Sequence, residues 1–344
     1  MKFTLFVSFF SWTIITSYAQ EAPKFSFDSY TEHLNNKMVQ DNFIGGLSGI
    51  TFDPYKNRYL AISDNSETPK NVTGIATIYS FDIVHRDSVM AIDNIAVLPL
   101  KDVLASTNPE SLRARKSDII ISTEGEDHTE VLKVSANGEL LEEIYQTKEM
   151  RYNSGIEGLC LTDNEKDLFI SMERPLDNHI VRGSAAEENL GVISIYRYNL
   201  ENNTLNGQFL YPLHLPSEGS QLTPKETESY RKDNGVTEIL AYNDSTLLFL
   251  ERAFLGRGNE NLHVRLYMAS ITNDNNLMEG NFELLKPVKV YDFYESNLPC
   301  KIDNIEGMTF SKDKKRLYLI SDDNFDRYGE QKTQIIALKV HRDQ

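Results

Sequence analysis

Cysteine is scarce in this chain. Among its 344 residues, only Cys160 and Cys300 carry a thiol. Two cysteines are too few for a disulfide scaffold or for a zinc site built from cysteines. Redox chemistry is therefore not expected.

Basic residues are outnumbered by acidic ones. The chain has 35 Lys and Arg against 51 Asp and Glu, which gives a net charge of −16. Such a charge opposes electrostatic binding to nucleic acid or to an anionic membrane surface, and it favours cations as partners. The hydrophobic fraction of 40% is that of an ordinary globular chain, which excludes the disordered and fibrous classes.

Long apolar runs are missing beyond the N-terminus. Lys2 precedes an uncharged apolar stretch at 3–15, and Ser17-Tyr18-Ala19 then has small residues at the spacing that a signal peptidase requires. Residues 1–19 are therefore predicted to be a cleaved export signal, which leaves a single domain over 20–344. The stretch is too short to span a bilayer, so we expect a secreted or periplasmic monomer without a membrane anchor.

Several catalytic signatures are also absent. The sequence has no P-loop, dinucleotide fingerprint, EF-hand loop or pair of histidines at metal-ligand spacing. Gly46-Leu47-Ser48-Gly49 lacks the final glycine of a nucleophile elbow, which favours a structural role for Ser48. His128 and His179 lie in loops after acidic strand ends, where a general acid could act, although solvated loop positions are more common for such histidines.

What the sequence does contain is a repeated unit. Each copy has two short apolar runs joined by polar turn residues, which is the pattern of a β-hairpin. The clear copies are Gly46–Asp64, Gly155–Glu173 and Asn304–Asp322, and the weaker ones are Pro109–Glu124 and Val236–Glu251. Further strand-like runs follow each hairpin, which makes about four strands per unit.

Four strands per unit are typical of a propeller blade, so the predicted fold class is an all-β propeller of five four-stranded blades. A sixth blade would need a degenerate unit within 175–235, where we expect one long insertion instead. Residues 24–27 are expected to supply the strand that the last copy lacks, and residues 281–285 the fourth strand of the copy before it. Because the third and fifth copies are not neighbours in such a ring, Cys160 and Cys300 are expected to be free, largely buried thiols.

Three segments carry a resemblance to a known family. They are Gly155-Ile156-Glu157-Gly158-Leu159, Leu250-Glu251-Arg252, and Asn304-Ile305-Glu306-Gly307-Met308 followed by Ser321-Asp322-Asp323-Asn324-Phe325. The chain resembles the phytase-like family, also described as esterase-like activity of phytase, from about Phe43 to Val340. The resemblance implies a secreted β-propeller and suggests phosphoester hydrolysis with calcium. The first copy departs from the pattern with Ser48 in place of Glu, and the second lacks the glycine after Glu110.

The repeat also predicts a gathering of acidic side chains. In a hairpin, the residue that enters the first strand lies beside the residue that leaves the second. The pairs so formed are Glu157 with Glu173, Glu306 with Asp322, Glu238 with Glu251, Glu110 with Glu124, and Ser48 with Asp64. Since all inner hairpins of a propeller point the same end at one face, these groups are expected around one mouth of the central channel. A Glu at this position can also serve only to hold the backbone of the next blade, and that alternative stays open above all for Glu110 and Glu238.

Carboxylates this close need bound cations, basic partners or raised pKa values. Calcium binds six to eight oxygen ligands of this kind, and the expected ligands are Glu157, Glu173, Glu251, Glu306 and Asp322. Arg174 and Arg252 directly follow two of these acids. Guanidinium groups suit the recognition of phosphate, although the same arginines could form plain salt bridges between blades.

The function that we predict from these residues is an exported hydrolase of a phosphate ester or related ester, in which a divalent cation assists. Its predicted catalytic residues are Glu157, Glu306, Arg174 and Arg252. The alternative is a non-catalytic propeller that binds a ligand, a glycan or a partner protein at the same mouth, with calcium serving only to rigidify it. The fold alone does not decide between the two, because propellers host both kinds of function.

Overall fold

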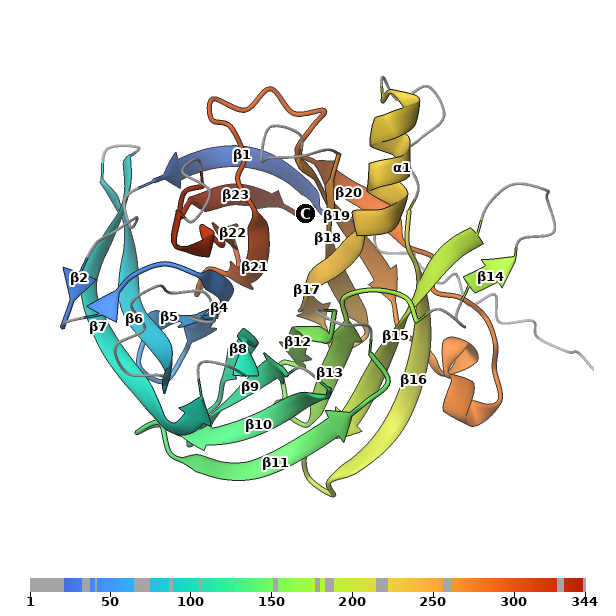
Figure 1. Cartoon of the computed structure of the whole chain (residues 1–344), viewed down its shortest axis with the longest axis horizontal. Coiled ribbons are helices and arrows are strands. Elements are labelled where there is room, and N and C mark those ends of the chain that lie inside the picture. Colours follow the sequence, from blue (N-terminus) through green and yellow to red (C-terminus); the bar gives the residue numbers. More distant parts are fainter. Residues whose placement is uncertain are drawn as a thin grey trace, which may run out of the picture.

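The computed structural model describes residues 22–32, 38–40, 42–64, 75–86, 89–104, 107–125, 127–150, 154–176, 180–182, 189–214, 222–255, 262–326 and 331–342. Within these residues, five β-sheets surround a central axis as the blades of a propeller (Figure 1). The predicted fold class and number of blades are confirmed. The predicted signal at 1–19 lies outside the described residues. None of the described helices combines the length and apolar character needed to cross a bilayer.

Each blade starts at the axis with the hairpin of the repeat and continues outward through antiparallel neighbours. Blade 1 contains β4 (Leu47–Asp53), β5 (Arg58–Ser63), β6 (Ile75–Arg86) and β7 (Val89–Leu104). Blade 2 contains β8 (Pro109–Ala114), β9 (Asp118–Glu124), β10 (Thr129–Ser135) and β11 (Leu140–Thr147). Blade 3 contains β12 (Ile156–Leu161), β13 (Asp167–Met172), β14 (Ile180–Arg182), β15 (Asn189–Asn199) and β16 (Thr204–Pro212). Blade 4 contains β17 (Gly235–Asn243), β18 (Thr246–Phe254), β19 (Leu262–Ser270) and β20 (Val288–Asp292). Blade 5 contains β21 (Ile305–Phe310), β22 (Arg316–Ser321), β23 (Ile335–His341) and β1 (Lys24–Thr31).

The two ends of the chain close the ring. β1 pairs antiparallel with β23, with Phe25 opposite Val340, so the first strand of the chain is the outer strand of the last blade (Figure 1). The prediction for residues 24–27 is confirmed. A small ribbon of β2 (Met38–Val39) and β3 (Asn42–Phe43) leads from β1 into blade 1.

The outer strand of blade 4 differs from the prediction. Residues 281–285 are irregular, and β20 takes the fourth place instead. The reason is local: short 3₁₀ helices occupy Asn273–Asn275 and Leu277–Glu279, and Gly280 follows with a φ of 81°. The backbone of Leu285 then bonds to Leu210 of blade 3, so this segment fills the space between two blades rather than extending one.

The insertion between β16 and β17 forms a helix and not a sixth blade. α1 (Pro224–Asp233) begins with a capping box, in which the Thr223 hydroxyl accepts from the Glu226 amide and the Glu226 carboxylate accepts from the Thr223 amide. Its buried Tyr230 packs with Ala253 and Leu255 at the end of β18. The helix therefore covers the end of blade 4 at which β18 ends. Another 3₁₀ helix, Asn324–Asp326, follows β22.

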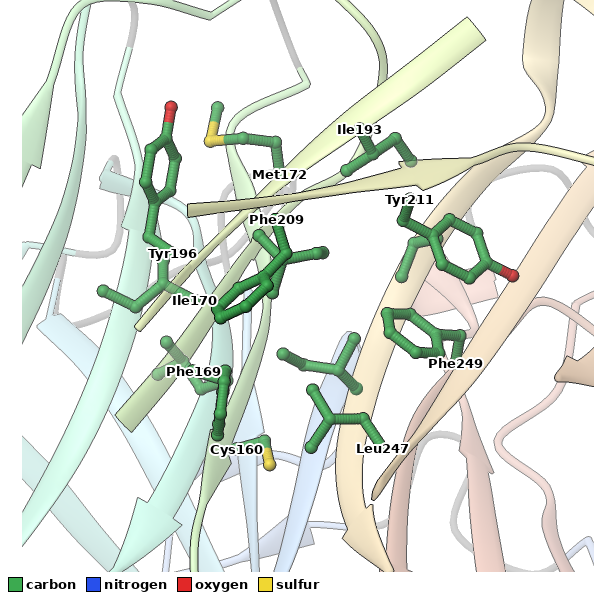
Figure 2. Close-up of a cluster of buried hydrophobic side chains, with 14 of the residues drawn as sticks. Cys160, Phe169, Ile170, Met172, Ile193, Tyr196, Phe209, Tyr211, Leu247 and Phe249 are labelled. Atoms are coloured by element: carbon green, nitrogen blue, oxygen red, sulfur yellow. The ribbon is translucent and has the colours of Figure 1, made fainter. Parts of the chain in front are cut away.

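The core lies between the faces of adjacent blades. Figure 2 shows the contact of blades 3 and 4, where Tyr211 of β16 stacks on Phe249 of β18 with ring centroids 4.2 Å apart. Burial of each such side chain stabilises the fold by about 2–3 kcal/mol. Cys160 is buried in this cluster and Cys300 is half-buried elsewhere. Both thiols are free, as predicted, although only Cys160 is fully buried.

Glycines allow the inner strands to approach one another around the axis. A Cβ atom at Gly307 would lie 2.8 Å from the carbonyl oxygen of Ser48 and 2.9 Å from the amide nitrogen of Ile50. A Cβ atom at Gly49 would come similarly close to the backbone of blade 2, and one at Gly158 would come similarly close to the backbone of blade 4. Real Cβ atoms do not approach backbone so closely, so these positions fix the narrow diameter of the ring.

Gly307→Ala is expected to lower the free energy of unfolding by about 1–3 kcal/mol, because the added methyl group meets backbone atoms that cannot rotate away. Urea denaturation measures this change. Gly207→Ala is the control and should have a smaller effect, since its new Cβ would meet side-chain atoms of Phe209 and Arg197 and no backbone. Equal effects of the two substitutions would contradict the proposed constraint.

Candidate functional site

The start of each inner strand carries an extra residue that is not paired across the hairpin. The register shifts lie between Leu47 and Gly49, Pro109 and Leu112, Ile156 and Gly158, Val236 and Glu238, and Ile305 and Gly307. Such a bulge turns its side chain away from the ladder. The residues at this bulge position are Ser48, Glu110, Glu157, Thr237 and Glu306.

The other member of each pair lies on the second strand or directly after it, where that strand stops pairing with the inner strand. Its amide bonds to the residue just before the inner strand, as in Glu124 to Asn108, Glu173 to Gly155 and Asp322 to Asn304. The residues at this strand-end position are Asp64, Glu124, Glu173, Arg252 and Asp322. The predicted pairing is therefore confirmed for blades 1, 2, 3 and 5.

The pairing predicted for blade 4 is wrong by one residue. Glu251 lies opposite Val236, and Arg252 lies opposite Gly235. The bulge of this blade is thus Thr237, and Glu238 occupies the position that is glycine in blades 1, 3 and 5. Blade 4 consequently presents Thr237 and Arg252 to the mouth, whereas every other blade has an acid at the strand-end position and only blade 1 also lacks one at the bulge.

Glu251 is buried away from this mouth, between blades 3 and 4. Its carboxylate accepts from the Tyr211 hydroxyl at 2.8 Å and from the Asn234 amide at 3.1 Å, and it lies 2.8 Å from Nδ1 of His214. The ring of His214 in turn stacks on Tyr267 with centroids 3.8 Å apart. These partners account for the carboxylate without a metal, so we do not place Glu251 among the metal ligands.

The tightest acidic cluster joins blades 2 and 3. Glu110, Glu124 and Glu157 each place one carboxylate oxygen within 4.8 Å of the others. Asn108 donates to Glu110, and the backbone amide of Gly155 donates to Glu124 at 2.6 Å. The set offers only oxygen donors on well-held side chains, which suits a hard divalent cation such as Ca²⁺. Of the five predicted metal ligands, only Glu157 belongs to this cluster.

Protons are held tightly by these carboxyl groups in the metal-free protein. Burial raises the pKa of Glu124 to about 7, and Glu173 adds to the effect. Burial and the neighbouring carboxylates also raise the pKa of Glu110 and of Glu157 well above 4.5. The cluster therefore cannot be fully ionised near neutral pH unless a cation joins it.

Arg252 neutralises part of the negative charge that the acids of blades 3 and 5 bring to the mouth. Its guanidinium lies 2.5 Å from Glu306 and 3.5 Å from Glu173, and it also donates to the side chain of Asn304. Burial lowers the pKa of Arg252, but the carboxylates of Glu306 and Glu173 outweigh burial and raise it. The side chain is 9% exposed, so it acts as a bridge between blades.

Arg174 is the freer of the two predicted arginines. Its guanidinium contacts Glu173 at 3.4 Å, and its side chain is 25% exposed against 9% for Arg252. An arginine in this state keeps donors available for an anion that enters the mouth. The predicted anion contact is thus better placed at Arg174 than at Arg252.

Asp322 completes the mouth on the side of blades 5 and 1. Burial raises its pKa well above 3.8, and Asp64 and Glu306 raise it further. Its Oδ1 accepts from the amide of Asn324 at 2.7 Å. Asp322 therefore lies near other acids, as predicted, but not in the cluster of Glu110, Glu124 and Glu157.

A buried ion pair blocks the channel beneath the mouth. Arg113 of blade 2 lies 2.8 Å from Glu238 of blade 4, although these blades are not neighbours in the ring. Glu238 also accepts from the Ser111 hydroxyl and the Leu159 amide, and Arg113 donates to the carbonyl of Ile239 at 2.9 Å. Burial raises the pKa of Glu238 to about 7, although Arg113 lowers it. The prediction that Glu238 could be purely structural fits this position.

Sequence reasoning missed two asparagines that hold the acids in place. Asn108 and Asn304 stand two residues before the bulge Glu of their blades, and each donates its side-chain amide to that Glu. The shared Asn-x-Glu spacing is the signal that could have found them. Of the histidines considered, His128 contacts Asp127 and Glu130 on the surface, and His179 lies outside the described residues.

Comparisons with known proteins identify a family and several similar structures. A family model described as phytase-like, esterase-like activity of phytase, matches residues 42–325. No curated protein matches the chain. Similar solved structures include a GH43_1 enzyme from Xanthomonas citri, with 8% identity, a TM-score of 0.47 and coverage of 90% of this chain and 88% of that chain. The PQQ-bound aldose sugar dehydrogenase from Streptomyces coelicolor has 8% identity, a TM-score of 0.41 and coverage of 93% and 100%.

Without divalent cations, the protein is expected to lose stability as the pH rises. The folded-state pKa of Glu124 is about 7 against an ordinary value of 4.5. The folded chain thus holds this proton more tightly, and the stabilisation present below pH 4.5 is lost as the pH rises toward 7. For Glu124 alone the loss is of the order of 3 kcal/mol.

Urea denaturation in chelator across this pH range measures the effect. Glu124→Gln should flatten the pH dependence, whereas the control Glu143→Gln, at an exposed position of β11, should leave it unchanged. A stability of the unsubstituted protein that is constant or rises with pH would contradict the assigned protonation.

Proposed function

This chain belongs to the phytase-like family, and we propose that it is a hydrolase of a phosphate ester or related ester that acts at the acidic mouth of its channel. The observation that carries the proposal is the three-carboxylate cluster of Glu110, Glu124 and Glu157 beside a partly exposed arginine, Arg174. A cation site next to an anion site is what the hydrolysis of a charged ester needs.

Calcium is the cation that we propose for this cluster. Glu110, Glu124 and Glu157 would hold it, because their oxygens are close together and their mutual repulsion is otherwise relieved only by protonation. When bound, such an ion polarises a phosphoryl or carbonyl oxygen and lowers the pKa of a coordinated water. The hard oxygen donors favour Ca²⁺ or Mg²⁺ over softer metals.

The remaining side chains of the mouth bind and orient the substrate in this proposal. Arg174 binds the anionic group of the ester. Arg252 is a positioning residue, since it fixes Glu306 and Glu173 by ion pairs and has little exposed surface of its own. Glu306, held by Asn304 at 2.9 Å, faces the substrate from blade 5 and orients the attacking water.

A non-catalytic binding propeller is the second candidate. The contacts of Arg252 with Glu306, Glu173 and Asn304 are those of a structural bridge between blades. If the whole mouth has this role, calcium would stabilise the ring without supporting turnover. The two candidates differ in whether a metal-dependent rate can be measured.

Glu110→Gln and Glu157→Gln are each expected to lower kcat/KM by about 100-fold or more, because both would remove charge from the cation site. The assays are phosphate release and p-nitrophenyl ester hydrolysis on purified protein, with Ca²⁺ and with chelator. Arg174→Met should raise KM more than it lowers kcat, since Arg174 binds the substrate. The exposed substitution Glu139→Gln is the control and should leave the rate unchanged.

Chelator should abolish turnover in the unsubstituted protein. If no phosphate ester or carboxylic ester is hydrolysed under any condition, and Ca²⁺ only raises the melting temperature, the hydrolase proposal is wrong and the binding propeller is correct.

A further inference from the structure

A cavity of about 460 Å³ opens at the opposite end of the channel. Its walls come from the far ends of the inner strands, including Phe52 of β4, Leu161 of β12, Leu240 of β17 and Phe310 of β21. The carboxylates of the mouth stand at the other ends of these strands, and Arg113 closes the floor of the cavity. It is therefore a separate chamber on the far side of the Arg113–Glu238 pair.

The walls of this far cavity are mostly apolar. Phe52, Leu161 and Leu240 are only partly buried and Phe310 is buried, and all of them face the space. A volume of this size is in the range of small-molecule sites, which are concave and largely apolar with a few polar groups. The body of a fitting ligand is thus apolar or aromatic.

The residues that line the cavity include three basic groups, Arg113, Lys312 and Lys314, and two acidic ones, Asp163 and Glu165. Lys314 spans the opening to Asp163 at 2.7 Å. Glu165 accepts from Tyr55 at 2.7 Å and lies near Arg115. Both lining acids thus have partners.

Lys312 differs from these groups because it has no acidic partner among the described residues. Its ammonium contacts the neutral amide oxygen of Asn57 at 2.8 Å. At the floor, Arg113 is 3% exposed, and its Nε has no hydrogen-bond partner among the described residues. Since Arg113 is already paired with Glu238, the ammonium of Lys312 is the group that favours an anion here, although the whole chain carries a net charge of −16.

We propose that the far cavity binds a small organic anion with an apolar or aromatic body. The body packs between Phe52 and Phe310 of adjacent blades, and the anionic group lies toward Lys312. The site is independent of the carboxylate mouth, so ligand binding here does not require a divalent cation.

The probe is 8-anilinonaphthalene-1-sulfonate, a fluorescent aromatic monoanion, titrated into the folded protein in chelator. We expect one bound probe per chain, displaced by benzoate but not by the neutral benzyl alcohol. Lys312→Glu should weaken binding about tenfold, since it reverses the charge beside the anionic group. Leu161→Trp should abolish binding, because the larger side chain fills the cavity.

Lys315→Glu is the matched control. It makes the same charge change in the same turn, but Lys315 is 78% exposed and does not line the cavity, so the affinity should change less than twofold. The proposal is wrong if no probe binds, if Lys312→Glu and Lys315→Glu have equal effects, or if benzyl alcohol competes as well as benzoate. Because the titration contains chelator, its outcome is separate from that of the hydrolase assays.

Discussion

The close approach of five inner strands to one axis is the constraint on which the rest of the structure depends. Glycines at 49, 158 and 307 allow backbone to meet backbone between blades. The two remaining blades place Ser111 and Glu238 at the same level, and Glu238 is bonded to Ser111 and to Arg113. The Arg113–Glu238 pair thus crosses the axis at its centre, between the carboxylate mouth and the far cavity.

The same geometry concentrates charge at one mouth. Because each blade begins its inner strand there, side chains from all five blades share a small, poorly hydrated space, and burial raises the pKa of several acids. The register of blade 4 breaks the symmetry by supplying Arg252, which neutralises Glu306 and Glu173. Glu110, Glu124 and Glu157 form no ion pair with an arginine among the described residues, and the pKa of each stays raised although Arg174 and Arg252 act on two of them. These three acids are therefore the place that we propose for a cation.

Much of this could be predicted from the sequence. The blades, the closure of the ring by residues 24–27 and most of the acidic pairs could be predicted from the repeat, because hairpins have a fixed geometry. The register of blade 4 could not be predicted, since Val236-Thr237-Glu238-Ile239 resembles the other copies while its bulge lies one residue earlier. The partners of Glu251 could not be predicted from the sequence either, because Tyr211 and His214 come from a neighbouring blade. Similarly, the spacing could not reveal which acids Arg252 would neutralise. The cation site was predicted from acids of blades 3, 4 and 5, whereas the site that we propose lies on blades 2 and 3.

In the proposed site, buried and protonated carboxyl groups at the mouth exchange their protons for a divalent cation. Calorimetric titration of the metal-free protein with Ca²⁺, in two buffers of different ionisation enthalpy, measures binding and proton release together. The account predicts binding that releases protons near pH 6 and releases fewer as the pH rises above 7, with both the binding and the release reduced in Glu124→Gln. Absence of binding, or binding without proton release at pH 6, would contradict it.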